Sequence, residues 1–283
     1  MTDTTIVKTV ANALQEDIGS GDITALLIDE NTIAKATIIS RQPAILCGVQ
    51  WANEVFHQLD KGIELVWQAK DGDSITPNQT ICHLKGSARA LLTGERTALN
   101  FLQTLSATAT RARQYAEAVE GTGVKVLDTR KTIPGLRLAQ KYAVHCGGCF
   151  NHRMGLYDGI LIKENHIEAA GSLENAIEHA LQIQHGLLNN NVLIEVEVET
   201  LEQVERALNA GAKRLLLDNM SMDQLGQAVA INHRHQKQAE LEASGGVSLN
   251  NIRLIAETGV DYISVGDLTK DLEAIDLSMR FAD

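Results

Sequence analysis

The stretch VLIEVEVETLEQVERALNAGAKRLLLDN, residues 192–219, decides the fold. Its first eight residues and the run RLLLD at 214–218 are rich in valine, isoleucine and leucine, as buried strands are. Between them, residues 200–212 read as a helix. A strand, a helix and a second strand of this kind predict two parallel strands with the helix packed against them.

The same alternation continues on both sides of this unit. Further strands are predicted at 124–128, 159–163, 240–244 and 262–266, with helical stretches between several of them. Six parallel strands are fewer than the eight of a closed barrel, so we predict an open, incomplete parallel α/β barrel. A doubly wound sheet is the alternative, but the glycine fingerprint of dinucleotide-binding sheets does not follow the first strand.

The first ~110 residues have a different pattern of apolar and turn residues. Residues 4–16 predict a helix with Ile6, Val7, Val10 and Leu14 on one side, and residues 87–119 predict one long helix or two. Short apolar runs separated by turn residues predict a small sheet with a helix packed on it. These runs lie at 34–40, 44–49, 63–69 and 80–86.

Composition narrows the possible partners. The 283 residues carry a formal net charge of −11, which argues against nucleic acid as the main partner and makes a local cluster of cations informative. The N-terminus lacks the pattern of a signal peptide, and no run reaches the roughly 18 apolar residues of a membrane span. We therefore expect a cytoplasmic protein with reduced thiols. Cys146 and Cys149 form a CxxC without a second pair, so ordinary buried thiols are favoured over a zinc or redox site.

Polar side chains recur at the carboxyl ends of the predicted strands, where α/β barrels build their active sites. Each has an ordinary structural explanation when it is taken alone, such as a solvated loop or a core histidine. Together they predict one site with many cations. The set comprises Asp128, Arg130, Lys131, His152, Arg153, Lys163, Glu164, Asn165, His166, Asp218, Asn219, Ser244, Gly245, Gly246, Gly266 and Asp267.

Three glutamates alternate in the strand at 192–199 and so share one face of it. Because a buried carboxylate without a partner is costly, at least one of Glu195, Glu197 and Glu199 needs a cation or a metal ion, unless the strand end reaches solvent. With Asp218 on the next strand, Mg²⁺ held mostly through water is plausible. The glycines after 240–244 and Gly266 predict a phosphate cradle, so the substrates should be polyanionic and one should be phosphorylated.

Several motifs, in order and over nearly the whole chain, resemble the quinolinate phosphoribosyltransferase family, the carboxylating nicotinate-nucleotide diphosphorylases of NAD biosynthesis. The most specific is DTRKTIPGLRLAQKYAVHCGGCFNHRMGLYDGILIKENHI, and the others are EDIGSGDIT, GERTALNFLQTLSATAT, EVEVET, LLLDN, EASGGV and DYISVGDLT. One departure is Cys149, where the family often has a third glycine. The pair Gly147–Gly148 remains, so we expect little consequence.

The resemblance implies an N-terminal α/β sandwich domain, residues 1–111, and an open α/β barrel, residues 112–274. It also implies that residues 275–283 pack back on the first domain. The family works as a homodimer, with each active site formed where the barrel of one subunit meets the N-terminal domain of the other.

The implied reaction joins quinolinate to phosphoribosyl pyrophosphate and gives nicotinate mononucleotide, CO₂ and pyrophosphate, with Mg²⁺. By position, the resemblance assigns quinolinate to Arg130, His152, Arg153, Lys163 and Arg96 of the partner subunit. It assigns phosphoribosyl pyrophosphate to Lys131, Glu197, Asp218, Ser244, Gly245, Gly246 and Gly266. Lys131, Glu197 and Asp218 are the expected catalytic residues, and Glu197 and Asp218 the expected metal ligands, through water.

Three alternatives stay open at this point. One is a paralogue of the same architecture that acts on another base or accompanies molybdate transport. The second is a Schiff-base aldolase that uses Lys163, although Lys131, Glu197 and Asp218 would then have no role. The third is a non-catalytic sensor of phosphosugars or anions, although no output segment is visible in the sequence.

Overall fold

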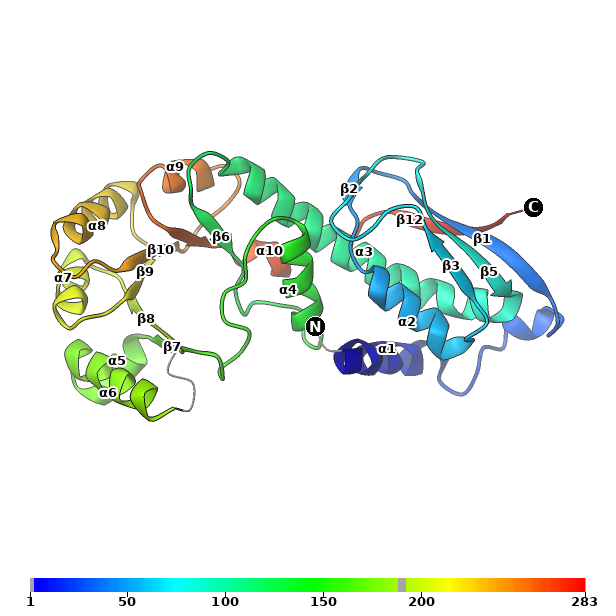
Figure 1. Ribbon diagram of the computed structural model, residues 1–283, viewed down its shortest axis with the longest axis horizontal. Coiled ribbons are helices and arrows are strands. Elements are labelled where there is room, and N and C mark those ends of the chain that lie inside the picture. Colours follow the sequence, from blue (N-terminus) through cyan, green and yellow to red (C-terminus); the bar gives the residue numbers. More distant parts are fainter. Residues whose placement is uncertain (1–2, 188–191, 283) are drawn as a thin grey trace. The chain divides into compact units, whose positions relative to one another are not determined.

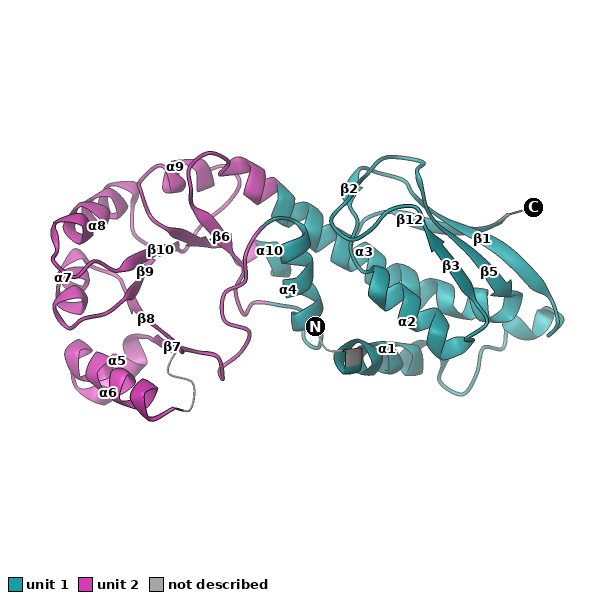
Figure 2. Cartoon of the chain, viewed as in Figure 1, with its two compact units in different colours: residues 1–113, 132–148, 268–283 teal, residues 114–131, 149–267 magenta. Residues whose placement is uncertain are grey.

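The protein is described here by a computed structural model that covers residues 3–187 and 192–282. It divides into two compact units (Figure 2). Unit 1 comprises residues 1–113, 132–148 and 268–283, and unit 2 comprises residues 114–131 and 149–267. The expected boundary after residue 111 therefore lies close to the end of the first segment of unit 1, whereas 132–148 join unit 1 rather than the barrel unit.

Unit 1 contains a four-stranded antiparallel sheet in the order β12-β1-β5-β3 (Figure 1). The strand β12 pairs with β1 from Lys35 opposite Ala282 to Ser40 opposite Leu277, so the C-terminal segment lies in this sheet. Asp283 lies outside the described residues. The strands span Ile33–Ser40 (β1), Glu64–Trp67 (β3), Thr80–Ser87 (β5) and Leu277–Ala282 (β12).

Three helices share one hydrophobic core with this sheet, and they are α1 (Asp3–Ile18), α2 (Val49–Leu59) and α3 (Ala88–Ala118). The stretch 87–119 thus forms one helix rather than two. Ile6, Val10 and Leu14 of α1 are buried as predicted, but Val7 is 44% exposed. A helix turns by about 100° per residue, so Val7 points well away from its neighbour Ile6.

One predicted strand of unit 1 is wrong in extent. Of residues 44–49, Ala44–Ile45 alone form a strand, β2, which pairs with β4 (Ser74–Ile75) in a separate two-stranded sheet. Gly48 adopts a φ of 110°, which ends the extended segment and starts α2. The remaining helices of unit 1 are η1 (Ala25–Leu27), α4 (Arg137–Cys146) and α10 (Asp267–Lys270). The first residue of α10 precedes the last segment of unit 1, which begins at residue 268.

Unit 2 is built on six parallel strands in the order β6-β11-β10-β9-β8-β7. In the described part of the chain, β6 and β7 are edge strands, so the sheet is open, as the sequence predicted. The helices α5 to α9 lie outside the curved row of strands (Figure 1). The strands span Lys125–Leu127 (β6), Gly159–Ile162 (β7), Leu193–Val198 (β8), Arg214–Asp218 (β9), Glu240–Ser244 (β10) and Tyr262–Ser264 (β11).

Capping residues fix where the helices of unit 2 begin. Thr200 and Ser221 form capping boxes at the starts of α7 (Leu201–Asn209) and α8 (Met222–Arg234), and Ser172 caps α6 (Leu173–Gly186). The loops before α7 and α8 are consequently short, which holds the polar residues at the strand ends in place. The other helices are α5 (Glu164–Ala170) and α9 (Ile252–Ala256).

Among the helices in the described ranges, none is both long and apolar enough to cross a bilayer.

Candidate active site

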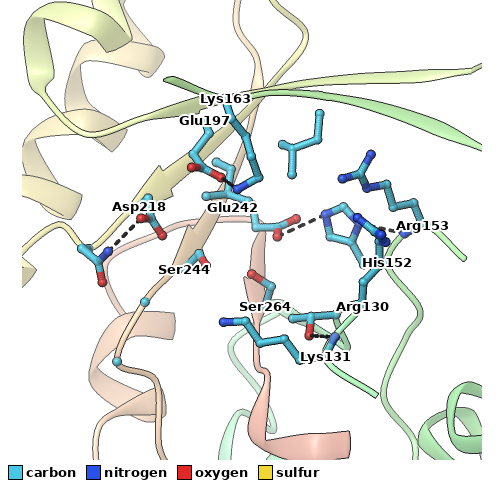
Figure 3. A pocket seen from close by; sticks show the side chains of 16 residues that line it. Arg130, Lys131, His152, Arg153, Lys163, Glu197, Asp218, Glu242, Ser244 and Ser264 are labelled. Carbon is cyan, nitrogen blue, oxygen red and sulfur yellow. Dashed lines mark hydrogen bonds and ion pairs between the residues drawn. The ribbon is translucent and has the colours of Figure 1, made fainter. Parts of the chain in front are cut away.

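A pocket of about 640 Å³ opens at the carboxyl ends of the parallel strands of unit 2 (Figure 3). Every strand of the sheet contributes to its wall, directly or through the loop that follows it, which is the arrangement of α/β active sites. The wall is formed by Thr129, Arg130, Lys131, His152, Arg153, Leu161, Lys163, Glu197, Leu216, Asp218, Asn219, Glu242, Ser244, Gly245, Gly246 and Ser264.

One ion pair joins the ends of β7 and β8. The Nζ of Lys163 donates to the Oε2 of Glu197, with the lysine side chain 43% exposed and the glutamate 10% exposed. Because Lys163 follows the last residue of β7 and Glu197 precedes the last residue of β8, the parallel pairing of these strands brings the two groups together. The pair leaves both charges at the edge of the pocket, where a polar ligand can reach them.

Three further cations line the pocket. Arg130 and Lys131 lie on the loop after β6, where the backbone N–H of Lys131 donates to the Thr129 hydroxyl at 3.0 Å. Arg153 donates from Nη1 to the carbonyl of Gly159 at 3.0 Å. Burial and then the charge of Arg130 lower the pKa of Arg153. Two guanidinium groups that repel each other in one pocket are suited to gripping an anion between them.

The backbone N–H and both ring nitrogens of His152 have hydrogen-bond partners within the protein. Its backbone N–H donates to the buried carboxylate of Asp128 at 2.9 Å. Its Nδ1 accepts from the backbone N–H of Arg153 at 2.7 Å, and its Nε2 lies 2.8 Å from Glu195 Oε2. Since Nδ1 is an acceptor in this geometry, the neutral ring carries its proton on Nε2 and donates it to Glu195.

A buried ion network supports His152. Arg214, at the start of β9, donates from Nε to Glu195 at 3.1 Å and from Nη2 to Glu242 at 2.7 Å. Both carboxylates are almost completely inaccessible to solvent. Burial would raise the pKa of Glu195, but the hydrogen bond to His152 and the charges of His152 and Arg214 lower it overall. Burial and then repulsion by Glu195 raise the pKa of Glu242 to about 7.

The ends of β9 and β10 form a tight glycine-rich corner. Asp218 lies opposite Ser244 in the register, and the N–H of Asn219 donates to the carbonyl of Ser244 at 2.9 Å. Asn219 has a positive φ of 54°, and its Nδ2 donates to Asp218 at 2.7 Å. Gly245 and Gly246 follow with φ values of 95° and 59°. The two glycines leave the first two positions of the loop after β10 without side chains, as a phosphate cradle requires.

Most residues that the sequence singled out lie in this pocket. They are Arg130, Lys131, His152, Arg153, Lys163, Glu197, Asp218, Asn219, Ser244, Gly245 and Gly246. Gly266 follows β11 but is not part of the wall, and Arg96 is an exposed residue of α3 in unit 1. The three glutamates of β8 differ, because Glu195 is buried on Arg214, Glu197 pairs with Lys163, and Glu199 is exposed after the strand.

All four cysteines are free thiols, with Cys149 buried and Cys146 partly buried. A hydrogen bond with Cys47 is the largest influence on the pKa of Cys146, which is lowered. Within the described residues, the group suited by distance to a metal ion contains no cysteine and consists of His152, Glu195 and Glu242.

Comparison with known proteins assigns the chain to a family. The description "Quinolinate phosphoribosyl transferase, C-terminal domain" matches residues 108–280, and the corresponding N-terminal domain matches residues 22–106. Together they cover most of the chain. The protein belongs to the quinolinate phosphoribosyltransferase family.

Individual members of the quinolinate phosphoribosyltransferase family are similar over nearly their full length. A probable carboxylating nicotinate-nucleotide pyrophosphorylase of Bacillus subtilis is 41% identical over 264 residues, 93% of this chain and 89% of the relative. The Mycobacterium leprae enzyme of that name is 38% identical, over 96% of this chain and 95% of its own. The solved nicotinate-nucleotide pyrophosphorylase of Francisella tularensis superposes with a TM-score of 0.94 at 45% identity, over 100% of this chain and 98% of its own.

Two residues of this quinolinate phosphoribosyltransferase family member were not predicted to belong to the site: Glu242, which lines the pocket, and its partner Arg214. Both were read as ordinary strand residues, and Asn219 was predicted only as a polar residue at a strand end. A charged residue inside an otherwise apolar strand is the available signal for the first two, since a buried charge needs a partner. The register that pairs Glu242 with Leu216, and so places it near Arg214 and Glu195, has no sequence signature.

Proposed function

We propose that the protein transfers the phosphoribosyl group of phosphoribosyl pyrophosphate to quinolinate and releases CO₂ and pyrophosphate, which yields nicotinate mononucleotide. The observation that carries this function is the pairing, in one pocket, of a cation cluster with a carboxylate pair and a bare glycine loop. The names of the relatives at 41% and 38% identity agree with it. The step belongs to de novo NAD biosynthesis.

The cations bind the planar dicarboxylate. Arg130 and Arg153 offer guanidinium forks that pair bidentately with carboxylates, and Lys163 adds a point charge. Both ring nitrogens of His152 have partners inside the protein, so His152 forms the wall and orients Arg153 rather than donating to quinolinate. This differs from the direct contact that the resemblance had assigned to His152.

The second half of the pocket binds the phosphorylated sugar. Lys131 faces the pyrophosphate, and the amides of Ser244, Gly245 and Gly246 surround the 5′-phosphate. Glu197 and Asp218 line the same wall from neighbouring strands and suit Mg²⁺ held through water. When bound, Mg²⁺ supplies positive charge to the pyrophosphate. We also propose that Gly266 lies beside the phosphate loop.

The chemistry needs no covalent intermediate with the protein. The quinolinate nitrogen forms a bond to the anomeric carbon as the bond to pyrophosphate breaks, and Lys131 stabilises the charge that develops on the leaving group. Glu197 faces the oxocarbenium-like carbon. The ring nitrogen is then cationic, so the bond from C2 to its carboxylate breaks, its electrons remain at C2, and a proton replaces CO₂.

A homodimer is proposed with this function. The segment after α1 exposes Ile23, Leu26 and Leu27 by 83%, 68% and 86%, and Asp22 anchors it to Thr93 of α3 at 2.9 Å. Arg96 lies one turn further along the same helix. An exposed apolar segment beside an exposed arginine suits a subunit interface through which Arg96 reaches the partner's quinolinate site. The free thiols fit the cytoplasm.

The aldolase alternative fits less well. In a Schiff-base aldolase, Lys163 would have to leave Glu197, and Lys131, Asp218 and the glycine loop would have no role.

The test is product analysis. Purified protein with quinolinate, phosphoribosyl pyrophosphate and Mg²⁺ should form nicotinate mononucleotide and CO₂ in equal amounts, detected by mass spectrometry and by release of label from the 2-carboxylate. The Lys131→Ala variant should form neither at a comparable rate. Absence of product from folded wild-type protein would refute the function.

A further inference from the structure

Four ionisable side chains with an unbalanced charge meet at the pocket, and two of them, His152 and Glu242, line it. The four groups are the carboxyls of Glu195 and Glu242, the guanidinium of Arg214 and the imidazole of His152. Glu242 itself reaches the pocket wall and points toward His152, with Oε1 at 3.5 Å from Nε2 (Figure 3). With a neutral imidazole and both carboxyls ionised, the cluster would carry one excess negative charge in a buried place, which is costly.

One additional proton removes that excess charge, and the geometry favours Glu242 as its site. A protonated His152 would carry hydrogen on Nδ1, where the backbone N–H of Arg153 already points at 2.7 Å. Glu195 is occupied by His152 and Arg214 on its two oxygens. Glu242 Oε1 is buried and has no hydrogen-bond partner among the described residues. Burial and Glu195 raise the pKa of Glu242 to about 7. Burial opposes the charged form of His152, but its hydrogen bond to Glu195 and the two carboxylates raise its pKa overall, so the unpaired Oε1 of Glu242 decides between the two sites.

The other charged neighbours do not supply the missing charge. Tyr262 of β11 stacks on the Arg214 guanidinium at 3.8 Å and stays neutral, because burial and its hydrogen bond to Glu240 raise its pKa. Glu240 lies 3.8 Å from Arg214 Nη1 and adds negative charge at the exposed end. Lys125 of β6 lies over the Tyr262 ring, with Nζ 5.7 Å from the ring centroid, and is not among the residues of the pocket wall.

Buried Asp128 accepts hydrogen bonds from Asn151 and from the backbone of His152. The other positive charges of the pocket wall that Glu242 shares are Arg130, Lys131, Arg153 and Lys163.

We propose that Glu242 is a positioning residue that takes up a proton when the dicarboxylate substrate binds. In the free pocket His152 and Arg214 favour the ionised form of Glu242, against burial and the charge of Glu195. A dianion bound in the pocket that Glu242 lines adds negative charge beside it, so that the neutral acid becomes the favoured form. The neutral acid no longer repels Glu195, so the hydrogen bond between Glu195 and His152, and with it the contact of His152 with the backbone of Arg153, stays in place. The inference rests on the proposed function, because a neutral ligand would not drive the uptake.

The experiment is a titration of the whole protein with quinolinate by calorimetry, at one pH, in buffers of different ionisation enthalpy. The slope of the observed enthalpy against the buffer enthalpy gives the number of protons bound. An acid with a pKa of about 7 is about half protonated at pH 7, so the uptake should be at most about half a proton there and larger at pH 8. Difference infrared spectroscopy should show a protonated-carboxyl band appearing on binding, and not an imidazolium signal.

Two variants separate this role from a merely structural one. Glu242→Gln keeps the shape of the side chain and removes the titration, so the uptake and the infrared band should disappear while quinolinate still binds, within about tenfold of wild type. Glu240→Gln makes the same change two residues earlier on β10, where the side chain is 52% exposed, and should retain both.

Each result decides something different. If wild-type protein binds quinolinate without proton uptake, or if Glu242→Gln takes up as much as wild type, the role of Glu242 is refuted and the proposed function stands. If neither the wild-type protein nor the variants bind quinolinate, the proposed function itself fails. If Glu242→Gln does not fold, wild type alone still decides: affinity should weaken towards tenfold per pH unit above pH 7, and a pH-independent affinity overturns the proposal.

Discussion

Alanine substitutions at two adjacent glycines after β10, Gly245 and Gly246, should have unequal effects because their surroundings differ. A Cβ on Gly245 would lie 2.1 Å from Oδ1 and 3.0 Å from the backbone N of Asn219, and the φ of 95° is unfavourable for alanine. A Cβ on Gly246 would meet nothing within 4 Å, at a φ of 59°. Gly246→Ala is therefore a matched control for Gly245→Ala, with the same chemical change and no collision.

The expected magnitudes follow from these contacts. Gly246→Ala carries the backbone cost of the left-handed region alone, about 1 kcal/mol of unfolding free energy. Gly245→Ala has a similar backbone cost and must also rotate Asn219 away from Asp218, to which it donates at 2.7 Å. Loss of that hydrogen bond and the close approach to the Asn219 backbone bring the total to roughly 2–4 kcal/mol.

Binding of phosphoribosyl pyrophosphate should follow the same order. Displacement of Asp218 and of the amide after Ser244 should raise the Kd at least about tenfold for Gly245→Ala, equivalent to about 1.4 kcal/mol, and only a few-fold for Gly246→Ala. Calorimetric titration with phosphoribosyl pyrophosphate and Mg²⁺, with denaturant unfolding in parallel, measures both quantities. Equal effects of the two substitutions would refute the reasoning, since the collision with Asn219 is what separates them.

Three other predictions test separate parts of the account. Lys131→Ala should lower kcat/KM at least a hundredfold with little change in unfolding free energy, and near-wild-type kinetics would remove Lys131 from the mechanism. Arg96→Ala and Lys163→Ala should each be inactive, whereas mixed dimers should recover activity; subunit exchange without recovery would contradict a shared site. The raised pKa of Glu242 contributes stability that is present below about pH 4.5 and lost as pH rises through about 7. That loss should be on the order of 3 kcal/mol in denaturant unfolding and absent in Glu242→Gln, and parallel curves would contradict it.

The fold of unit 2 was accessible from sequence because its strands are short, apolar and regularly separated. The run RLLLD coincides with β9 and ELEAS with β10, and the others differ from the observed strands by one or two residues at their ends. Unit 1 was less accessible. The apolar run at 44–49 reads as a strand, yet Gly48 turns the chain into a helix after two paired residues. The local pattern does not contain that turn.

The residues of the site also fall into those that the sequence predicted and those that it did not. Cations and glycines at strand ends were found because parallel strands bring their carboxyl ends to one edge whatever the exact register. The support beneath them was not found, because it depends on register and depth. At least one of Glu195, Glu197 and Glu199 was predicted to need a partner, but the partner of Glu195, Arg214, stands on the neighbouring strand and also binds Glu242. Side-chain spacing along one strand carries no information about such cross-strand contacts.

The central claim is that the cation cluster recognises a dicarboxylate. The most direct measurement compares initial rates with quinolinate and with nicotinate, each with phosphoribosyl pyrophosphate and Mg²⁺, following the loss of quinolinate absorbance and the formation of mononucleotide. We predict turnover of quinolinate and none of nicotinate, because the monocarboxylate leaves part of the cluster Arg130, Arg153 and Lys163 without an anion. Equal turnover of both, or turnover of neither by folded protein, would contradict the account.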